Sequence, residues 1–298
     1  MWPPLPSLVS GARVVGRIRC AGLSSTRKAR ARGTAGTRSR PTVHLAGPDL
    51  PGGVFSRAFK AFLTDALAVL DLGLDRTRLD ALDHFCRFVL TENEVQNLTT
   101  LVSPFEMAVK HVLDSLTCVL TGLFDGPRRV IDIGSGAGFP GLPLKIARPY
   151  LSMTLLDSSQ KRAAFLARAV KSLSLEGCAV ECARAEAFGR RLERRESFDV
   201  AVVRAVAGLA ASLEYGVPVL RVGGSLVSMK GPSVGGELEQ ARRAAGVLGA
   251  ELAGVRELTL PLAGDTRNLV VFTKVSRTPP AYPRREGVAS RRPLGRTS

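Results

Sequence analysis

VIDIGSGAGFPGLP, residues 130–143, is the stretch that decides the fold of this 298-residue chain. A short apolar run ends in glycines at positions 134, 136, 138 and 141, and the pattern of an amphipathic helix follows. Glycine lets a chain turn sharply from a strand into a helix and lets the backbone approach a ligand closely. The start of the helix offers free N–H groups at the positive end of its dipole. The stretch therefore predicts a strand–turn–helix unit that binds a cofactor containing adenosine.

The residues around this stretch narrow the choice of cofactor. Residues 154–157 predict a second strand that ends in Asp157, and an acid at this place in a Rossmann-like sheet binds ribose hydroxyls. Asp132 is an acid inside an apolar strand, and a buried acid needs a partner such as an ammonium group or a turn N–H. The glycines follow G-x-G-x-G, whereas dinucleotide-binding folds use G-x-G-x-x-G. We therefore favour S-adenosylmethionine over NAD; the alternative without a cofactor is a plain strand–turn–helix with solvated acids.

The net charge of +16 is concentrated at the two ends of the chain. Residues 1–48 contain nine Arg or Lys and no acid, and residues 277–298 contain six Arg and one acid, which leaves the region between them nearly neutral. Basic segments of this kind are attracted to polyanions such as RNA without reading their sequence. The 277–298 segment, rich in Pro and Arg, is expected to be disordered.

The composition of residues 1–48 leaves their origin open. They resemble an organelle transit peptide, and equally a disordered bacterial extension or a start codon assigned too far upstream. The chain has no run of about 18 uncharged apolar residues, so no membrane span is expected. Its five cysteines and three histidines are dispersed without the spacing of metal ligands, so no metal site is expected. The protein is expected in the cytoplasm, or in an organelle if a transit peptide is present.

Periodicity divides the rest of the chain into two parts. Residues 55–72, 79–90 and 104–120 have the apolar spacing of helices and predict an N-terminal helical cap. From residue 129 short strands alternate with helices, which predicts a parallel sheet covered on both faces. Strands are expected at 129–133, 153–156, 178–183, 198–203, 223–229, 253–260 and 268–274, and helices at 141–148, 159–174, 207–220 and 235–248.

The end of the sheet identifies the fold class. Residues 261–267 are too few for a parallel crossover, so the last strand is expected to run antiparallel. A mostly parallel seven-stranded sheet with a reversed last strand is the pattern of an α/β class I methyltransferase. The predicted domains are a basic extension (1–48), the helical cap (49–125), a Rossmann-like methyltransferase domain (126–276) and a basic tail (277–298).

Separate motifs within residues 55–275 resemble those of one family in this class. They are NLT (97–99), KHVLDSL (110–116), DIGSGAGFPG (132–141), LLDS (155–158) with KR (161–162), RAE (184–186), SFD (197–199) with RA (204–205), and KG (230–231). The family is the bacterial small-subunit ribosomal RNA guanine-N7 methyltransferase G, also called glucose-inhibited division protein B. Two positions depart from its usual pattern, with Glu92 where tryptophan is usual and Asn268 where histidine is common.

The resemblance implies which residues bind S-adenosylmethionine. It implies cofactor contacts by Gly134, Phe139, Ala185, Glu186 and Arg204. The reading of the residues themselves adds Gly136 of the turn and Asp157 at the end of the second strand.

The resemblance also implies a substrate, guanine N7 of 16S ribosomal RNA or of a ribosomal particle. N7 carries a lone pair and no proton, so methyl transfer needs no general base, and no residue can be singled out as catalytic. Candidates for substrate binding are His111, Arg204 and Lys230, of which Arg204 could pair with an RNA phosphate or with the methionine carboxylate. The alternatives are a methyltransferase with a protein or small-molecule acceptor and a non-catalytic RNA-binding assembly factor. No apolar stripe remains to require a dimer, so a monomer is expected.

Overall fold

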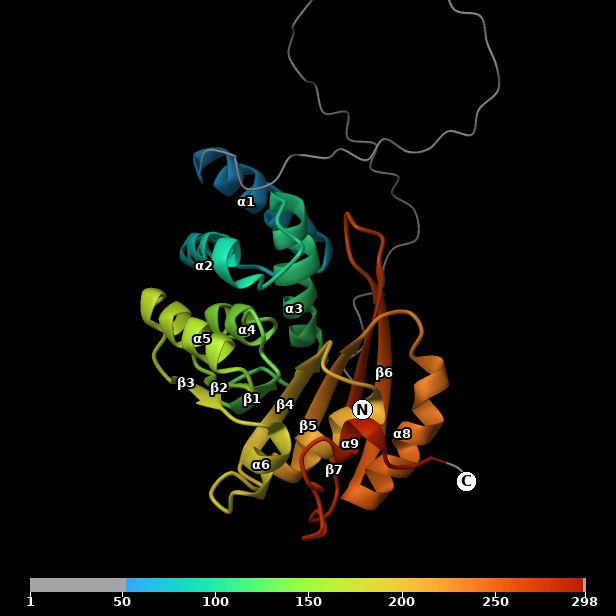
Figure 1. Cartoon of the computed structure of the whole chain (residues 1–298). Helices are drawn as coiled ribbons and strands as arrows, with labels where there is room; N and C mark the ends of the chain where they lie inside the picture. Colours follow the sequence, from blue (N-terminus) through green and yellow to red (C-terminus); the bar gives the residue numbers. More distant parts are fainter. Residues whose placement is uncertain (1–51, 297–298) are drawn as a thin grey trace, which may run out of the picture. The chain divides into compact units, whose positions relative to one another are not determined.

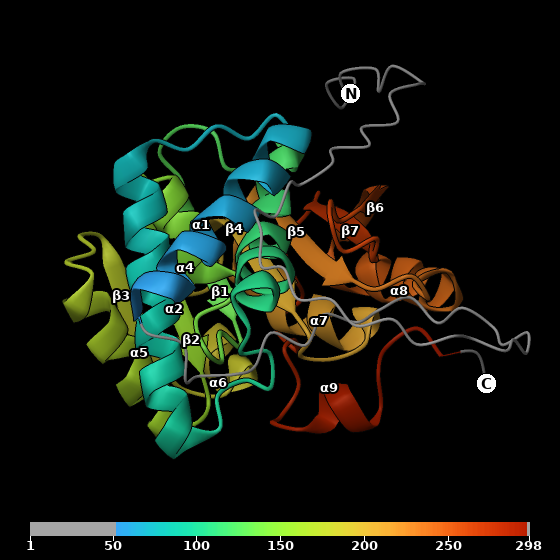
Figure 2. The ribbon, with the colours of Figure 1, turned by 90° about the horizontal axis from the view of Figure 1, so that it is seen from above.

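Seven strands form one sheet in the order β3-β2-β1-β4-β5-β7-β6 (Figures 1 and 2). The structure, a computed structural model, describes residues 52–296, so the expectations for residues 1–48 lie outside it. The strands are β1 (Arg129–Ile133), β2 (Ser152–Asp157), β3 (Cys178–Cys182), β4 (Phe198–Arg204), β5 (Leu220–Lys230), β6 (Ala250–Thr259) and β7 (Thr266–Lys274). Strands β1 to β5 pair in parallel, and β7 lies antiparallel between β5 and β6. The predicted fold class and the reversed last strand are thus confirmed.

Helices cover both faces of this sheet. They are α4 (Gly141–Ala147), α5 (Gln160–Ser172), α6 (Ala185–Arg190), α7 (Leu209–Gly216), α8 (Gly235–Leu248) and α9 (Val288–Arg291). Ile131 and Ile133 of β1 share a buried apolar cluster with residues of α7 and α8. The intervening Asp132 points the other way, towards the start of α4, where a Cβ on Gly141 would lie 2.7 Å from its carboxylate. Alternation along β1 therefore gives each face its own contacts.

The N-terminal helices pack beside α4 and α5 (Figure 1). They are α1 (Gly52–Val69), α2 (Arg76–Gln96), the π-helix η1 (Glu106–Leu113), α3 (Asp114–Leu116) and the 3-10 helix η2 (Thr117–Thr121). The sequence predicts one helix over 104–120, and the structure is helical there, although η1, α3 and η2 are of three different types. The Ser115 and Thr117 hydroxyls donate to the His111 and Asp114 carbonyls, and such bonds compete with the regular helical ladder. Among residues 52–296, no helix has both the length and the hydrophobicity needed to cross a bilayer.

The C-terminal segment corrects the sequence analysis. Residues 277–298 are expected to be disordered, but residues 278–295, called here the C-terminal strap, lie against the sheet domain and contain α9 beside α7 (Figure 2). Glu214 of α7 has no exposed side-chain surface, and its carboxylate accepts from the Arg284 guanidinium at 2.6 Å. Composition predicts disorder because a segment with few apolar residues and a high net charge has little to bury. Here Arg284 pairs with a buried acid and Ala289 is itself buried, so the strap is held in place.

The Arg284–Glu214 ion pair is expected to hold the strap in place. Replacing Arg284 by Met leaves a fully buried carboxylate unpaired, so the free energy of unfolding should fall by about 3 kcal/mol. The measurement is urea unfolding monitored by circular dichroism. The double variant Arg284→Met/Glu214→Leu, which removes both charges, should recover most of that loss. A loss below about 0.5 kcal/mol in the single variant would show that the pair does not anchor the strap.

Candidate functional site

A cavity of about 340 Å³ lies at the carboxyl ends of β1, β2 and β3. Its lining residues are Ile133, Gly134, Leu156, Asp157, Ser158, Ala183, Arg184, Ala185, Glu186, Val206, Tyr215, Glu286, Gly287 and Ser290. Four of the residues predicted to bind the cofactor are therefore brought together here: Gly134, Asp157, Ala185 and Glu186. The carboxyl edge of a parallel sheet, where the strand order reverses next to β1, is the place where such folds bind ligands.

The glycine turn after β1 forms the floor of this first cavity. Gly134, Gly136 and Gly138 have φ values of 75°, 56° and 92°, a left-handed region that favours glycine. A Cβ on Gly134 would lie 2.5 Å from the Val206 side chain, so any larger residue would have to displace the adjoining loop. The N–H groups of Gly134 and Ser135 both donate to the Leu156 carbonyl, at 2.7 and 3.1 Å. These bonds join the turn to the end of β2.

Asp157 is the acid that the sequence predicts at the end of β2, and it is tied to the turn. Its Oδ2 accepts from the Gly136 N–H at 2.9 Å and its Oδ1 accepts from the Ser159 N–H at 2.8 Å. Gly136 does not line the cavity itself and acts through this bond. A carboxylate oxygen can accept more than one hydrogen bond, so the fixed Asp157 side chain can still receive hydroxyl groups of a ligand.

Asp132 lies under the turn and is fully buried. Its Oδ2 accepts from the Gly141 N–H at 2.9 Å, which supplies the turn N–H that the sequence analysis requires. Its Oδ1 is buried with no hydrogen-bond partner in the part of the chain that the structure describes. Burial raises the Asp132 pKa to about 7, although the Gly141 N–H opposes the shift. Asp132 does not line the first cavity, so this oxygen is an unsatisfied acceptor inside the fold, beneath the turn.

A second cavity, of about 350 Å³, lies next to the first at the ends of β4 and β5. It is lined by Leu101, Lys110, His111, Asp114, Val203, Arg204, Ala205, Ala207, Ser228, Met229, Lys230, Gly231 and Arg267. The three residues predicted to bind substrate, His111, Arg204 and Lys230, are brought together here. Arg204 does not line the first cavity. The sequence did not single out Lys110 and Arg267 for this site; Arg267 is expected in the connection 261–267 but is the second residue of β7.

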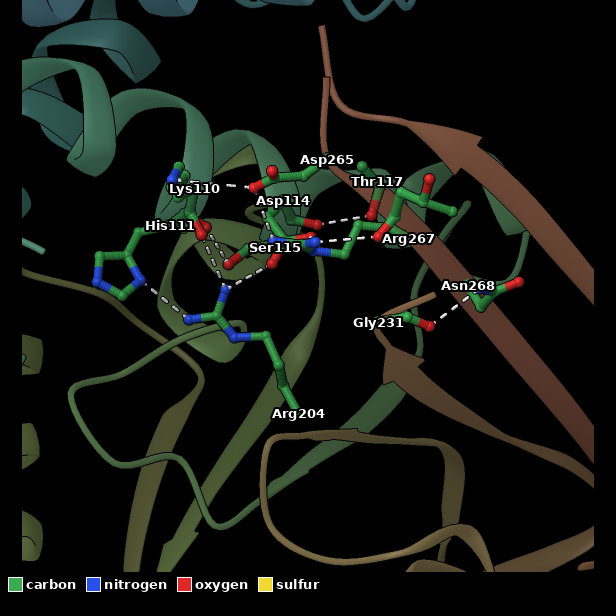
Figure 3. A network of polar contacts seen from close by, with 11 residues as sticks. Lys110, His111, Asp114, Ser115, Thr117, Arg204, Gly231, Asp265, Arg267 and Asn268 are labelled. Carbon is green, nitrogen blue, oxygen red and sulfur yellow. Dashed lines mark hydrogen bonds and ion pairs between the residues drawn. The ribbon is translucent and has the colours of Figure 1, made fainter. Parts of the chain in front are cut away.

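One buried carboxylate organises the second cavity (Figure 3). Asp114 accepts from Arg204 at 3.0 Å and from Arg267 at 3.1 Å. Burial raises the Asp114 pKa, while the two guanidinium groups counter that effect. The two arginines are therefore oriented before any ligand arrives, and their planar groups suit oxyanions.

His111 continues this network as a neutral imidazole. Its Nδ1 lies 3.1 Å from an Arg204 nitrogen, and because arginine only donates, Nδ1 must be the acceptor. The proton then resides on Nε2, which lies 2.8 Å from the Thr99 hydroxyl. Burial, together with the Arg204 charge, lowers the His111 pKa to about 3.

Phe139 packs against two members of this network, His111 and Arg204. Its ring stacks on the His111 ring at a centroid distance of 4.4 Å, and the Arg204 guanidinium lies 5.5 Å from it. Phe139 is buried and lines neither cavity, so the structure places it in packing contact with substrate-side residues. A cofactor contact by Phe139 stays a prediction.

The segment after β4 separates the two cavities. Val206 lines the first cavity, while Arg204, Ala205 and Ala207 line the second. Ala205 has φ of 56°, which is unfavourable for a residue with a Cβ, and such strain is held where the surroundings fix the backbone. Lys230 donates to the Ala207 carbonyl at 3.0 Å and pairs with Glu237 at 3.1 Å, and these contacts fix the segment.

Comparisons of this sequence with a family model and with curated proteins all find the same family. The family model described as GidB, rRNA small subunit methyltransferase G, matches residues 78–270, more than half of the chain. A relative from Roseiflexus castenholzii, named "Ribosomal RNA small subunit methyltransferase G", is 44% identical over 75% of this chain and 94% of its own length. Relatives of the same name from Carboxydothermus hydrogenoformans and Desulforamulus reducens are 43% and 39% identical, covering 79% and 78% of this chain and 100% and 97% of theirs.

The buried Asp132 is expected to make stability depend on pH. Its folded-state pKa of about 7 lies above its ordinary value of 3.8, so the folded state holds the proton more tightly. The stabilisation is complete below the ordinary value and is lost as pH rises through 7. The free energy of unfolding of the wild type should therefore fall between about pH 4 and pH 8 more steeply than that of Asp132→Asn. Parallel curves from urea unfolding would contradict this.

His111 is expected to remain neutral over the physiological range. With a pKa of about 3, its ring should show no titration between about pH 5 and pH 8. Long-range ¹H–¹⁵N NMR spectra of ¹⁵N-histidine-labelled protein, assigned with a His111→Gln variant, should show the Nε2–H tautomer throughout. A His111 titration with a midpoint near its ordinary value would show that Arg204 does not hold Nδ1 as an acceptor.

Proposed function

We propose that this chain, which belongs to the rRNA small subunit methyltransferase G family, transfers a methyl group from S-adenosylmethionine to N7 of a guanine in 16S ribosomal RNA. The observation that carries this proposal is the family match over residues 78–270. That span contains the glycine turn and every lining residue of the second cavity. The two cavities, one on each side of the segment after β4, provide places for two reactants.

The first cavity is assigned to the cofactor. When bound, S-adenosylmethionine supplies a methyl group carried on a positively charged sulfur. Asp157 would accept the ribose hydroxyls, as an acid at the end of the second strand does in related sheets. Gly134, Ala185 and Glu186 would contact the adenosine part, and Gly136 would act by holding Asp157. The carboxylates of the lining, Asp157, Glu186 and Glu286, suit a ligand that carries hydroxyls and positive charge.

The second cavity is assigned to the guanine nucleotide. Lys110, Arg204, Lys230 and Arg267 give it four basic side chains. Three carboxylates pair with them, Asp114 of the lining and Asp265 and Glu237 from outside it, which leaves one basic charge in excess. This excess of positive charge suits an RNA phosphate backbone. His111 and Arg204, with Phe139 behind them, offer flat groups on which a purine base can stack.

No proton has to be removed from the acceptor, because guanine N7 in RNA carries a lone pair. The residues of this chain therefore act by orientation and by electrostatics. The Asp114 network fixes the two arginines, and His111 stays uncharged beside the base. A neutral imidazole does not oppose the positive charge that moves onto the purine.

We infer further that the protein works as a monomer in the cytoplasm, on ribosomal RNA or a ribosomal particle. The large apolar side chains that are exposed within residues 52–296 are scattered over several elements, among them Val95, Leu192 and Leu262. Scattered exposure of this kind is usual for a monomer. Sedimentation of the purified protein tests this point.

The decisive experiment is methyl transfer to small-subunit RNA from a strain that lacks the gene for this protein. With labelled S-adenosylmethionine, nucleoside analysis should find label in N7-methylguanosine, on naked RNA or on assembled subunits. Cofactor binding without transfer to either form would favour a protein or small-molecule acceptor. Binding of RNA without binding of cofactor would favour an assembly factor.

Gly136→Asp is the matching loss-of-function variant. It places a carboxylate at the turn that donates to Asp157 and should abolish cofactor binding and methyl transfer. Gly126→Asp is the control, because Gly126 has a similar φ of 74° and open space, but lies in an exposed turn outside both cavities. Both variants carry the same backbone cost of about 1–2 kcal/mol, so only a selective loss of calorimetric binding in Gly136→Asp supports the assignment.

A further inference from the structure

The C-terminal strap contributes to the first cavity although the family match ends at residue 270. Glu286, Gly287 and Ser290 line that cavity on the side facing Ala185 and Glu186. The Gly287 N–H donates to Glu186 Oε1 at 2.8 Å, between residues separated by 101 positions in the chain. A residue predicted to bind the cofactor is thus held by a segment that the motifs do not include.

The strap is built into the domain along its whole length. Thr278 and Tyr282 carbonyls accept from Arg195 at 2.6 and 2.7 Å, and the Pro283 carbonyl accepts from Arg190 at 2.8 Å. The Arg284 guanidinium forms a two-pronged pair with the buried Glu214, and the Arg284 N–H donates to the same carboxylate at 2.8 Å. These contacts fix residues 278–284, which directly precede the strap residues that line the cavity.

The far end of the strap is fixed as well. Gln240 and Arg243 of α8 donate to the carbonyls of Leu294 and Gly295 at 2.9 and 2.8 Å. Between the two anchored ends, Ala289 is completely buried in the apolar cluster of α7 and α8. The cavity-lining residues lie between these anchor points, so their position is set by the domain.

We propose that the C-terminal strap is the outer wall of the cofactor pocket, and that Gly287 and Ser290 make it a binding element for the adenosine part of the ligand. This inference rests on the proposed function, because it takes the first cavity as the cofactor site. The Gly287 N–H occupies Glu186 Oε1 and orients the carboxylate. Oε2 has no hydrogen-bond partner in the described structure and is left to accept from a ligand amine or hydroxyl.

The adenosine side is favoured by the position of the strap. Asp157, the predicted ribose acceptor, and Ala185 and Glu186, after β3, line the same cavity as Gly287 and Ser290. The reacting methyl group has to face the second cavity, and Val206, which lines the first cavity, is the chain neighbour of Ala205 and Ala207, which line the second. The strap should therefore contact the adenosine part of the ligand, which does not react. Such contacts raise the affinity for the cofactor and do not touch the methyl group that is transferred.

The first test is hydrogen–deuterium exchange of the full-length protein with and without saturating S-adenosylhomocysteine. Amides of residues 284–290 should exchange more slowly with ligand, together with those of the glycine turn, residues 134–138. Protection of the turn without any change at 284–290 would overturn the inference and leave the proposed function intact. No protection at either place would mean that the ligand does not bind the first cavity, and the proposed function would fail first.

The second test uses substitutions on the strap that leave its bonds to Arg190, Arg195 and Glu214 in place, although Ser290→Trp also removes the bond from the Ser290 hydroxyl to the Gly287 carbonyl. Ser290 and Arg285 are both exposed, but only Ser290 lines the cavity. Ser290→Trp should weaken binding of S-adenosylhomocysteine by about tenfold or more through overfilling of the pocket. Arg285→Trp should bind as the wild type does, and the melting temperatures of both variants should match the wild type. Equal affinity in the two variants would overturn the inference.

A ligand without the amino-acid part locates the contact. 5′-Methylthioadenosine has the adenosine half of the cofactor and lacks the amino and carboxylate groups. Ser290→Trp should weaken its binding by the same factor as it weakens S-adenosylhomocysteine. Unchanged binding of methylthioadenosine, with weakened S-adenosylhomocysteine, would place the strap against the amino-acid part and overturn the assignment to adenosine.

Discussion

The hydrogen bond from the Gly136 N–H to the Asp157 carboxylate, 2.9 Å long, is the contact on which the first cavity depends. It joins a turn that only glycines can form easily to the end of the neighbouring strand. The same turn donates two further N–H groups to the Leu156 carbonyl. Together these bonds set the floor of the cavity and the start of α4 before any ligand is present, so binding need not first order the backbone.

Buried carboxylates paired with arginine recur around this floor, each in a different role. Asp114 holds Arg204 and Arg267 in the second cavity, and Glu214 holds Arg284 and with it the C-terminal strap. An unpaired buried carboxylate is costly, so each acid strongly favours the geometry that brings its arginine partners to it. Asp132 differs from both, because no basic side chain pairs with it among the described residues, and burial raises its pKa to about 7.

Much of the fold and part of the site could be predicted from local patterns. The range 129–133 for β1, the reversed last strand, and the grouping of Gly134, Asp157, Ala185 and Glu186 at one edge all follow from periodicity and from the rule that parallel strands end together. The helix expected over 104–120 is present, but its change from π to α to 3-10 type was not predicted, because it accompanies bonds from the Ser115 and Thr117 hydroxyls to backbone carbonyls. The prediction that residues 277–298 are disordered was wrong, because composition does not reveal that Arg284 pairs with the buried Glu214.

By itself, therefore, the sequence determined the strand–turn–helix unit, the order of strands and helices along the chain, and the family. These depend on short motifs and on the spacing of apolar residues, both of which lie between near neighbours in the chain. Only the tertiary structure decided the arginine network and the wall of the cofactor pocket. Arg204 and Arg267 reach Asp114 across 90 and 153 positions, and Arg284 reaches Glu214 across 70. Pairings over such separations leave no periodic signal, since they form only when the sheet has brought their elements together.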